Sequence, residues 1–239
     1  MYHNIGIPPK EAKLRGLYVT PRMFRFQMWY LKQAGFQVVS LKEIVDFAKG
    51  GNARGKNLIS LTFDDGYLDF CDNAFPVLKK YGYPATVFVV SGLAGRHNLW
   101  DADGLGVKKA LMDWEKIRFL DENGITIGAH TQTHPKLGSI ATDDAGREIF
   151  GSKAQIEKQT GGRVDFFCYP YGDFNGAAVQ AVKEAGFLGA VSVGRGFVFR
   201  GDDPFTLKRI PVRLNTWPLS FICKLHSDYE IKKGRPRQA

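Results

Sequence analysis

The sequence predicts a single-domain α/β fold in which parallel strands alternate with helices. Apolar runs of strand length, rich in branched and aromatic residues, alternate with segments of helical periodicity along the 239 residues. The connections between successive runs are too long for hairpins, which indicates parallel strands joined by crossover helices. No repeat, low-complexity tract or linker divides the chain. Both an open doubly wound sheet and a closed barrel fit this pattern and length.

Seven segments have the composition of buried strands. They are residues 36–39, 58–63, 85–90, 125–129, 165–169, 189–193 and 209–212. The first predicted helix covers residues 21–34, with Thr20 as its N-cap and Gly35 at its end. The later predicted helices are 41–49, 67–81 with a kink at Pro76, 114–122, 142–159, 175–185 and one that begins at Pro218. Residues 50–55 are expected to form a loop, and the irregular stretch 92–113 to lie over one end of the fold.

Composition and charge argue against a membrane-spanning or nucleic-acid-binding protein. No window approaches the roughly 18 uninterrupted apolar residues of a membrane span. The formal net charge of +9 comes partly from residues 231–239, and the other basic residues are scattered among acidic ones. They form no basic stripe interleaved with aromatics, as a nucleic-acid surface would. A solvated surface is the interpretation we favour, although the same charge would suit an anionic glycan or a membrane surface.

Cysteine usage and the first residues bear on the cellular compartment. The three cysteines, Cys71, Cys168 and Cys223, are far apart and show no Cys-x-x-Cys spacing. The sequence therefore predicts neither a zinc site made of thiolates nor a disulfide framework. Residues 1–9 lack the basic and apolar regions of a signal peptide, so a cytoplasmic location is expected unless a leader has been removed.

Two short motifs could carry chemistry, and both follow predicted strands. Asp64 and Asp65 come directly after the strand at 58–63, and two adjacent aspartates both stay ionised only beside a cation or hydrogen-bond donors. His130 and His134 begin at the end of the strand at 125–129, and a helical turn there would place both rings on one face. Taken alone, the first motif could be a surface turn and the second an incidental pair. Parallel strands bring their carboxyl ends to one rim, where two imidazoles and a carboxylate would suit a catalytic metal.

Three motifs together resemble those of the polysaccharide deacetylase (NodB-like) family. They are TFDDG at 62–66, HTQTH at 130–134 and FCYPYG at 167–172, in the order and at the spacing of that family. The resemblance extends from the N-terminus to about Val212. It implies a distorted (β/α) barrel, here of about seven parallel strands. A catalytic domain is expected over residues 1–230, followed by a basic, disordered tail at 231–239. Members of the family remove N- or O-acetyl groups from glycans with a divalent metal.

The resemblance assigns a role to each motif residue. Asp64 is expected to be the general base, and Asp65, His130 and His134 the metal ligands. The metal would lower the pKa of its bound water and polarise the acetyl carbonyl, while Asp64 takes the proton of the attacking water. Zinc is the expected ion for this ligand set, and cobalt or nickel would also fit. The backbone N–H of Tyr171 is expected to stabilise the oxyanion together with the metal.

Two histidines compete for the role of general acid. Residues 224–228 are a loose match to a late family motif that supplies a histidine, which would be His226. The branch of the family similar to poly-N-acetylglucosamine deacetylases opens instead with a Tyr-His pair, and this chain opens with Tyr2 and His3. We favour His3. The alternatives are a disordered terminal residue for His3 and a solvent-facing helix position for His226.

One departure from the family concerns the partner of Asp64. Many members carry an arginine that pairs with the catalytic aspartate, at the position of Cys168 in this chain. Arg209, expected at the start of a strand, is the candidate replacement, with a surface ion pair as the alternative. We group Arg209 with Pro170 and Tyr171 on the substrate and oxyanion side of the site.

The sequence leads to one main functional hypothesis. It is a metal-dependent hydrolase that removes acetyl groups from sugars containing N-acetylglucosamine, with a carbohydrate as its partner. Trp100 and Tyr171 could stack on sugar rings, although buried aromatics are the commoner explanation. The alternatives are an amide hydrolase of a non-sugar substrate and an inactive glycan-binding relative. A nucleic-acid binder would rest on charge alone.

Overall fold

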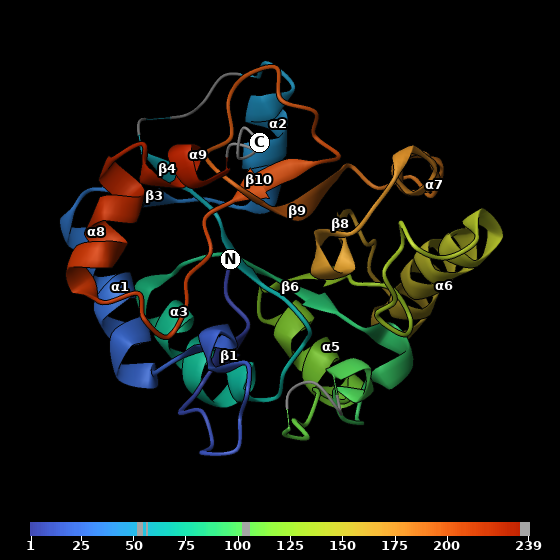
Figure 1. Ribbon diagram of the computed structural model, residues 1–239, viewed down its shortest axis with the longest axis horizontal. Coiled ribbons are helices and arrows are strands. Elements are labelled where there is room, and N and C mark those ends of the chain that lie inside the picture. Colours follow the sequence, from blue (N-terminus) through green and yellow to red (C-terminus); the bar gives the residue numbers. More distant parts are fainter. Residues whose placement is uncertain (52–54, 56, 102–105, 235–239) are drawn as a thin grey trace.

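A curled sheet of six parallel strands lies at the centre of the computed structural model, which describes residues 1–51, 55, 57–101 and 106–234 (Figure 1). The strand order is β10-β9-β8-β7-β6-β5, so each strand lies beside its neighbour in sequence. The strands are β5 (Leu61–Phe63), β6 (Ala85–Val89), β7 (Thr126–Ala129), β8 (Phe166–Cys168), β9 (Gly189–Arg195) and β10 (Leu207–Arg209). The prediction of a distorted β/α barrel is confirmed.

The sheet does not close between β5 and β10, which lie at its opposite edges. Tyr2 lies alongside β5, where its N–H donates to the carbonyl oxygen of Thr62 over 2.8 Å and its carbonyl accepts from the N–H of Asp64 over 3.0 Å. Two short parallel pairs lie outside the main sheet. They are β1 (Asn4–Ile5) with β2 (Tyr18–Val19), and β3 (Gln37–Val38) with β4 (Leu58–Ile59).

The strand expected at 58–63 is divided in the structure. Its first half, β4, pairs with β3, and its second half, β5, pairs with β6. Ser60 separates the two halves. The segment expected as the first strand therefore contributes to a separate pair, and the main sheet has six strands instead of about seven.

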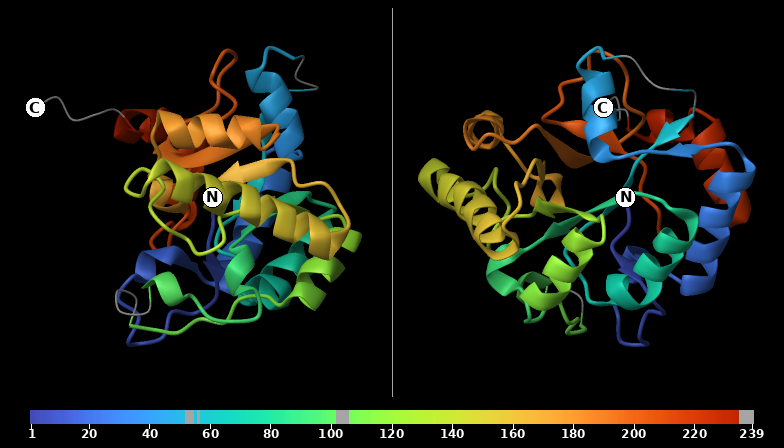
Figure 2. Two further views of the ribbon diagram at one scale, coloured as in Figure 1. Left: turned by 90° about the vertical axis from the view of Figure 1, so that its right-hand side faces the viewer. Right: turned by 180° about the vertical axis from the view of Figure 1, so that it is seen from behind.

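Helices surround the outer face of the sheet (Figures 1 and 2). They are α1 (Pro21–Gln33), α2 (Leu41–Ala48), α3 (Phe75–Tyr81), α5 (Trp114–Glu122), α6 (Thr142–Thr160), α7 (Gly176–Glu184), α8 (Pro218–His226) and α9 (Tyr229–Gly234). The Thr20 hydroxyl caps α1 by accepting from the N–H of Met23, and Ser40 and Glu43 form a capping box on α2. The helix expected to kink at Pro76 is instead a π-helical turn, Phe70–Ala74, followed by α3 with Pro76 in its first turn.

The C-terminal segment differs from expectation. Residues 231–234, expected at the start of a disordered tail, belong to α9, and residues 235–239 lie outside the described residues. The loop expected at 50–55 also falls partly outside them, as does the middle of the 92–113 stretch. Within the described ranges, the helices lack the length and the hydropathy that a membrane span needs.

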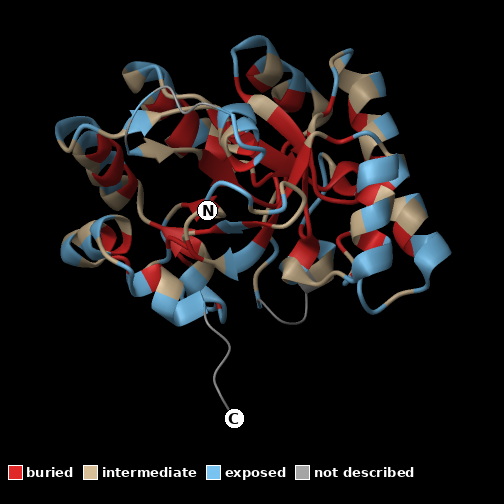
Figure 3. Cartoon of the chain, turned by 90° about the horizontal axis from the view of Figure 1, so that it is seen from above, coloured by how far each residue is buried: buried red, intermediate tan, exposed pale blue. Residues whose placement is uncertain are grey.

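The main core lies between the strands and the inward faces of the helices, where Figure 3 shows buried residues. Five of these helices contribute a fully buried aliphatic side chain to this core: Leu31 from α1, Leu78 from α3, Leu120 from α5, Ile149 from α6 and Val182 from α7. Each such side chain stabilises the fold by about 1.5–3 kcal/mol through burial. This packing holds the carboxyl ends of the strands in fixed positions, and the candidate site lies there.

Candidate active site

Strained backbone conformations are concentrated at the carboxyl ends of the strands. Five residues other than glycine have a positive φ in the described chain, and four of them lie here: Asp65, Thr131, His134 and Tyr171. Such conformations cost of order 1–3 kcal/mol each and persist where the surrounding structure enforces them, often at functional sites. Gly66 follows Asp65 with φ 71°, and a Cβ at Gly66 would lie 3.2 Å from the Val89 side chain. The turn after β5 therefore needs glycine at this position.

Asp65, His130 and His134 form a compact set of ligand atoms. Asp65 Oδ1 lies 3.3 Å from His130 Nε2 and 3.4 Å from His134 Nε2, and all three side chains are buried. In a tetrahedral site with ligand distances of about 2.0–2.1 Å, neighbouring ligand atoms lie about 3.3 Å apart. The two distances from Asp65 therefore match those around a bound metal ion, and all three ligand atoms lie within 4.8 Å of one another.

The environment of His130 supports the same interpretation. Its Nδ1 lies 2.6 Å from the carbonyl oxygen of Cys168. Because a carbonyl only accepts hydrogen bonds, Nδ1 carries the proton in the neutral ring and Nε2 presents its lone pair toward Asp65. A second hydrogen bond of this kind is typical of histidines that bind metals, where it fixes the ring and its tautomer.

The two histidines do not lie on a helical turn, the arrangement that would have placed both rings on one face. Residues 130–134 form an irregular loop, in which the positive φ of Thr131 and of His134 reverses the chain. The Thr131 hydroxyl accepts the N–H of His134 over 2.9 Å. Glu148 of α6 accepts the N–H groups of Gln132 and Thr133 over 2.7 and 2.9 Å. These hydrogen bonds hold the loop in the conformation that places both rings beside Asp65.

Asp64 is held by Arg209. The two η nitrogens of Arg209 donate to the two carboxylate oxygens of Asp64, each over 2.7 Å, and both side chains are buried. The guanidinium also donates to Thr62 Oγ1, to the carbonyl oxygen of Ser192 and, over 3.3 Å, to Cys168 Sγ. Burial alone would raise the pKa of Asp64, but the charge and hydrogen bonds of Arg209 outweigh it and lower the pKa.

Arg209 lies at the carboxyl end of β10, not at the start of a strand as expected. Its guanidinium lies beside the sulfur of Cys168, the position at which the family resemblance led us to expect an arginine. In this chain the cation that faces Asp64 therefore comes from β10 instead of β8.

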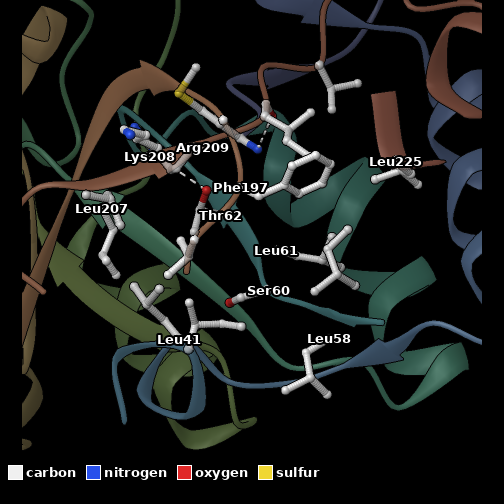
Figure 4. Close-up of a pocket in the computed structure, with 18 of the residues that line it drawn as sticks. Leu41, Leu58, Ser60, Leu61, Thr62, Phe197, Leu207, Lys208, Arg209 and Leu225 are labelled. Carbon is white, nitrogen blue, oxygen red and sulfur yellow. Dashed lines mark hydrogen bonds between the residues drawn. The ribbon is translucent and has the colours of Figure 1, made fainter. Parts of the chain in front are cut away.

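Arg209 also borders an apolar cavity of about 320 Å³, which Asp64 does not line (Figure 4). Leu41, Leu61 and Leu207 are among its lining residues, and Thr62 and Arg209 border it. Apolar surroundings strengthen the attraction between the two charges and make either charge alone expensive to bury.

A second cavity, of about 310 Å³, contains the candidate catalytic groups and is called here the catalytic cavity. Its lining comprises Met1, His3, Leu14, Leu17, Asp64, Asp65, Trp100, His130, His134, Tyr169, Tyr171, Val193, Arg195, Pro211 and Arg213. His3 Nε2 lies 3.9 Å from Asp64 Oδ2. The His226 ring is elsewhere, on α8, with its Nε2 2.9 Å from the Tyr30 hydroxyl.

Aromatic rings surround His134. The Trp100 ring stacks on it with the centroids 4.4 Å apart, and the Tyr171 ring meets it edge-on at 4.6 Å. Tyr171 is half-exposed at the rim of the catalytic cavity, whereas Pro170 is buried and does not line it. Arg209 does not line it either, and its guanidinium instead holds the Asp64 carboxylate, the role expected for it as the replacement cation.

Comparison with known proteins decides the family. The sequence profile described as polysaccharide deacetylase matches residues 51–190, more than half of the chain. The chain belongs to the polysaccharide deacetylase family. A poly-beta-1,6-N-acetyl-D-glucosamine N-deacetylase of Staphylococcus epidermidis is 27% identical over 211 residues, which are 87% of this chain and 72% of that protein.

Solved structures of deacetylases share the fold. The Streptococcus pyogenes deacetylase PplD, in complex with acetate, superposes with a TM-score of 0.82 at 26% identity, covering 95% of this chain and 96% of that one. IcaB from Ammonifex degensii superposes with a TM-score of 0.80 at 24% identity, covering 94% of each chain. Because the identity to IcaB is only 24%, this similarity supports a shared fold and no shared role.

Sequence reasoning missed three polar side chains that line the catalytic cavity of this family member. They are Tyr169, Arg195 and Arg213. Tyr169 was placed inside a strand, and the two arginines were not singled out. Arg213 directly follows the strand expected at 209–212, and Arg195 is the last residue of β9. The rule that singled out Asp64, that polar residues at the carboxyl ends of parallel strands meet at one rim, would have found both arginines.

Proposed function

We propose that this member of the polysaccharide deacetylase family hydrolyses the acetamide of N-acetylated sugars, in oligo- or polysaccharides that contain N-acetylglucosamine. One observation carries the proposal. A metal-type set of one carboxylate and two imidazoles lies beside a second buried carboxylate, Asp64, which Arg209 keeps ionised. The name of the Staphylococcus epidermidis relative supports the substrate class.

Asp65, His130 and His134 would hold a divalent ion, with zinc as our first choice and cobalt or nickel as alternatives. Such an ion, when bound, supplies a Lewis acid that polarises the acetyl carbonyl and acidifies a water molecule. Asp65 and both histidines are buried and restrained by the strained loops, so the ligand atoms need little rearrangement.

Asp64 is the proposed general base. It lines the catalytic cavity next to Asp65, and its lowered pKa keeps it ionised at neutral pH. Asp64 accepts a proton from the attacking water as the oxygen of that water bonds to the acetyl carbon. Arg209 fixes the orientation of the carboxylate through both oxygens, which leaves their remaining lone pairs to meet the water.

His3 is the proposed general acid. Collapse of the tetrahedral intermediate breaks the bond between the carbonyl carbon and nitrogen, and the leaving nitrogen must gain a proton to depart as an amine. The His3 ring lines the same cavity and lies 3.9 Å from Asp64, close enough to serve the same reacting centre. The backbone N–H of Tyr171 is our candidate donor to the oxyanion.

The stoichiometry of products tests this function. N-deacetylation of N-acetylglucosamine oligomers should release one acetate and expose one free amine per bond cleaved. Acetate without new amine would instead indicate removal of O-acetyl groups. Release of acetate from an acetylated lysine peptide, with none from any acetylated sugar, would favour the non-sugar amide hydrolase. A protein that binds the oligomers with metal present but releases nothing would be a glycan-binding relative.

A further inference from the structure

Two arginines line the catalytic cavity and have no part in the chemistry proposed above. Arg195 is the last residue of β9, and Arg213 lies in the loop after β10, so both belong to the β9–β10 side of the cavity. Val193 of β9 and Pro211, which follows β10, also line the cavity. A sugar bound to the catalytic groups would therefore have two guanidinium groups nearby.

Arg195 is held in place from behind by α9. Its Nε donates to Glu230 Oε2 over 2.8 Å, and its guanidinium lies over the Tyr229 ring at 5.9 Å. Glu230 is fully buried, and its other oxygen accepts from Lys224. One carboxylate thus faces two cations, and the cluster of Arg195, Lys224 and Glu230 keeps a net charge of +1.

Arg213 is exposed and forms no ion pair with any described residue. Its backbone is nevertheless fixed, because its N–H donates to Thr216 Oγ1 over 2.9 Å. Its side-chain stem passes Gly16, where a Cβ would lie 4.0 Å from the arginine Cδ. The guanidinium is therefore available to a ligand at the edge of the cavity.

The acidic groups of the cavity do not cancel these charges. Asp64 is neutralised by Arg209, and Asp65 faces the two histidines. Lys136 adds a further cation at the rim, with its Nζ 5.7 Å from the centroid of the Tyr171 ring. A cavity with excess positive charge attracts anions and repels cations.

We propose that Arg195 and Arg213 form an anion-binding subsite, so that the preferred substrate carries a carboxylate or phosphate on or next to the acetylated sugar. This inference rests on the proposed function. Arginine suits such groups because its planar guanidinium can donate two parallel hydrogen bonds to two oxygens. The same charges disfavour sugars that already carry a free ammonium group, so acetylated anionic segments are selected over deacetylated ones.

Matched substrates test the subsite. The first pair is a disaccharide of N-acetylglucosamine and N-acetylmuramic acid beside its methyl ester, which removes only the charge. The second pair is a phosphorylated N,N′-diacetylchitobiose beside N,N′-diacetylchitobiose itself. For metal-loaded protein we expect kcat/KM for acetate release to favour the charged member of at least one pair by about tenfold. A preference in the first pair would identify a carboxylate as the recognised group, and a preference in the second pair would identify a phosphate.

Variants assign the preference to the subsite. Arg213→Gln should remove most of it, Arg213→Lys should retain part, and Arg25→Gln, an exposed arginine on α1 outside the cavity, should leave it intact. Ratios near one for both pairs in the wild type would overturn the proposal. So would a preference that Arg213→Gln does not change.

A binding measurement separates this proposal from the proposed function. Calorimetry on metal-loaded Asp64→Asn should show tighter binding of the charged member, and Arg213→Gln added to it should abolish the difference. Selective binding by a wild type that releases no acetate would keep the subsite and reject the deacetylase. Acetate release with no selectivity would keep the deacetylase and reject the subsite.

Discussion

Arg209 and Asp64 join the two open edges of the sheet. Asp64 follows β5 and Arg209 ends β10, strands that lie at opposite edges, yet their side chains meet through two hydrogen bonds of 2.7 Å each. Tyr2 lies next to this pair through its backbone bonds to Thr62 and Asp64. The ion pair therefore orients the proposed base and also ties the sheet across its gap.

Arg209→Met should destabilise the protein by about 3–5 kcal/mol, because it leaves the buried Asp64 carboxylate without its partner. Chemical denaturation would measure the loss. Adding Asp64→Asn to Arg209→Met should recover part of it, since the second change removes the unpaired charge. Lys42→Met, which breaks an exposed pair with Asp46, should leave the free energy of unfolding almost unchanged. Equal effects of the two single variants would refute a buried role for Arg209.

His134→Ala should abolish stoichiometric metal binding, because it removes one of three buried ligands. Elemental analysis of the purified protein would show this directly. Added zinc should raise the melting temperature of the wild type and not of the variant, since a ligand that binds only the native state stabilises it. His226→Ala removes a histidine outside the catalytic cavity and should leave both readouts unchanged. Metal retained by His134→Ala would exclude the proposed ligand set.

His3→Ala should lower kcat for N-acetylated sugars by about 10²–10⁴-fold if His3 protonates the leaving nitrogen. An aryl acetate has a leaving group that departs without a proton, so its hydrolysis should fall far less. The ratio of the two activities is the measurement, and His226→Ala is the matched control. A similar loss on both substrates would point to a structural role for His3 instead.

The ionisation of Glu230 should make the free energy of unfolding depend on pH in the acidic range. Burial would raise its pKa, but hydrogen bonds from Arg195 and Lys224 lower it below its ordinary value of 4.5. The stability gained from the charged form is therefore complete above pH 4.5 and is lost as the pH falls through the lower folded value. Unfolding free energies measured from neutral pH downward should show the wild type losing its advantage over Glu230→Gln. A difference that stays constant with pH would contradict this.

The fold was predictable because most strands are apolar runs and most successive strands of the main sheet are joined by a helix. Most boundaries agree within one or two residues, as for the helix predicted at 114–122, which is α5. The division of the 58–63 segment was not predictable, because both halves are equally apolar. Which neighbour each half pairs with is decided by the surrounding strands and not by its own residues.

The site was predictable where residue type and strand ends carry the signal. Asp64, Asp65, His130 and His134 were expected on one rim, and the structure brings all four into one cavity. The conformation of the loop that carries the histidines was not predictable, because Thr131 and His134 adopt a positive φ although neither is a glycine. The strand that contains Arg209 was predicted to begin two residues too late. Arg209 was therefore expected at the start of this strand, whereas it lies at its carboxyl end.

Acetate release by Asp64→Asn tests the central claim most directly. The wild type, loaded with metal, should release acetate from N-acetylglucosamine oligomers. Asp64→Asn should do so at least about a hundredfold more slowly while binding the same amount of metal, because it loses the base and keeps the three ligands. Equal rates for the two proteins, or a metal-loaded wild type that releases no acetate from any N-acetylated sugar, would contradict the account.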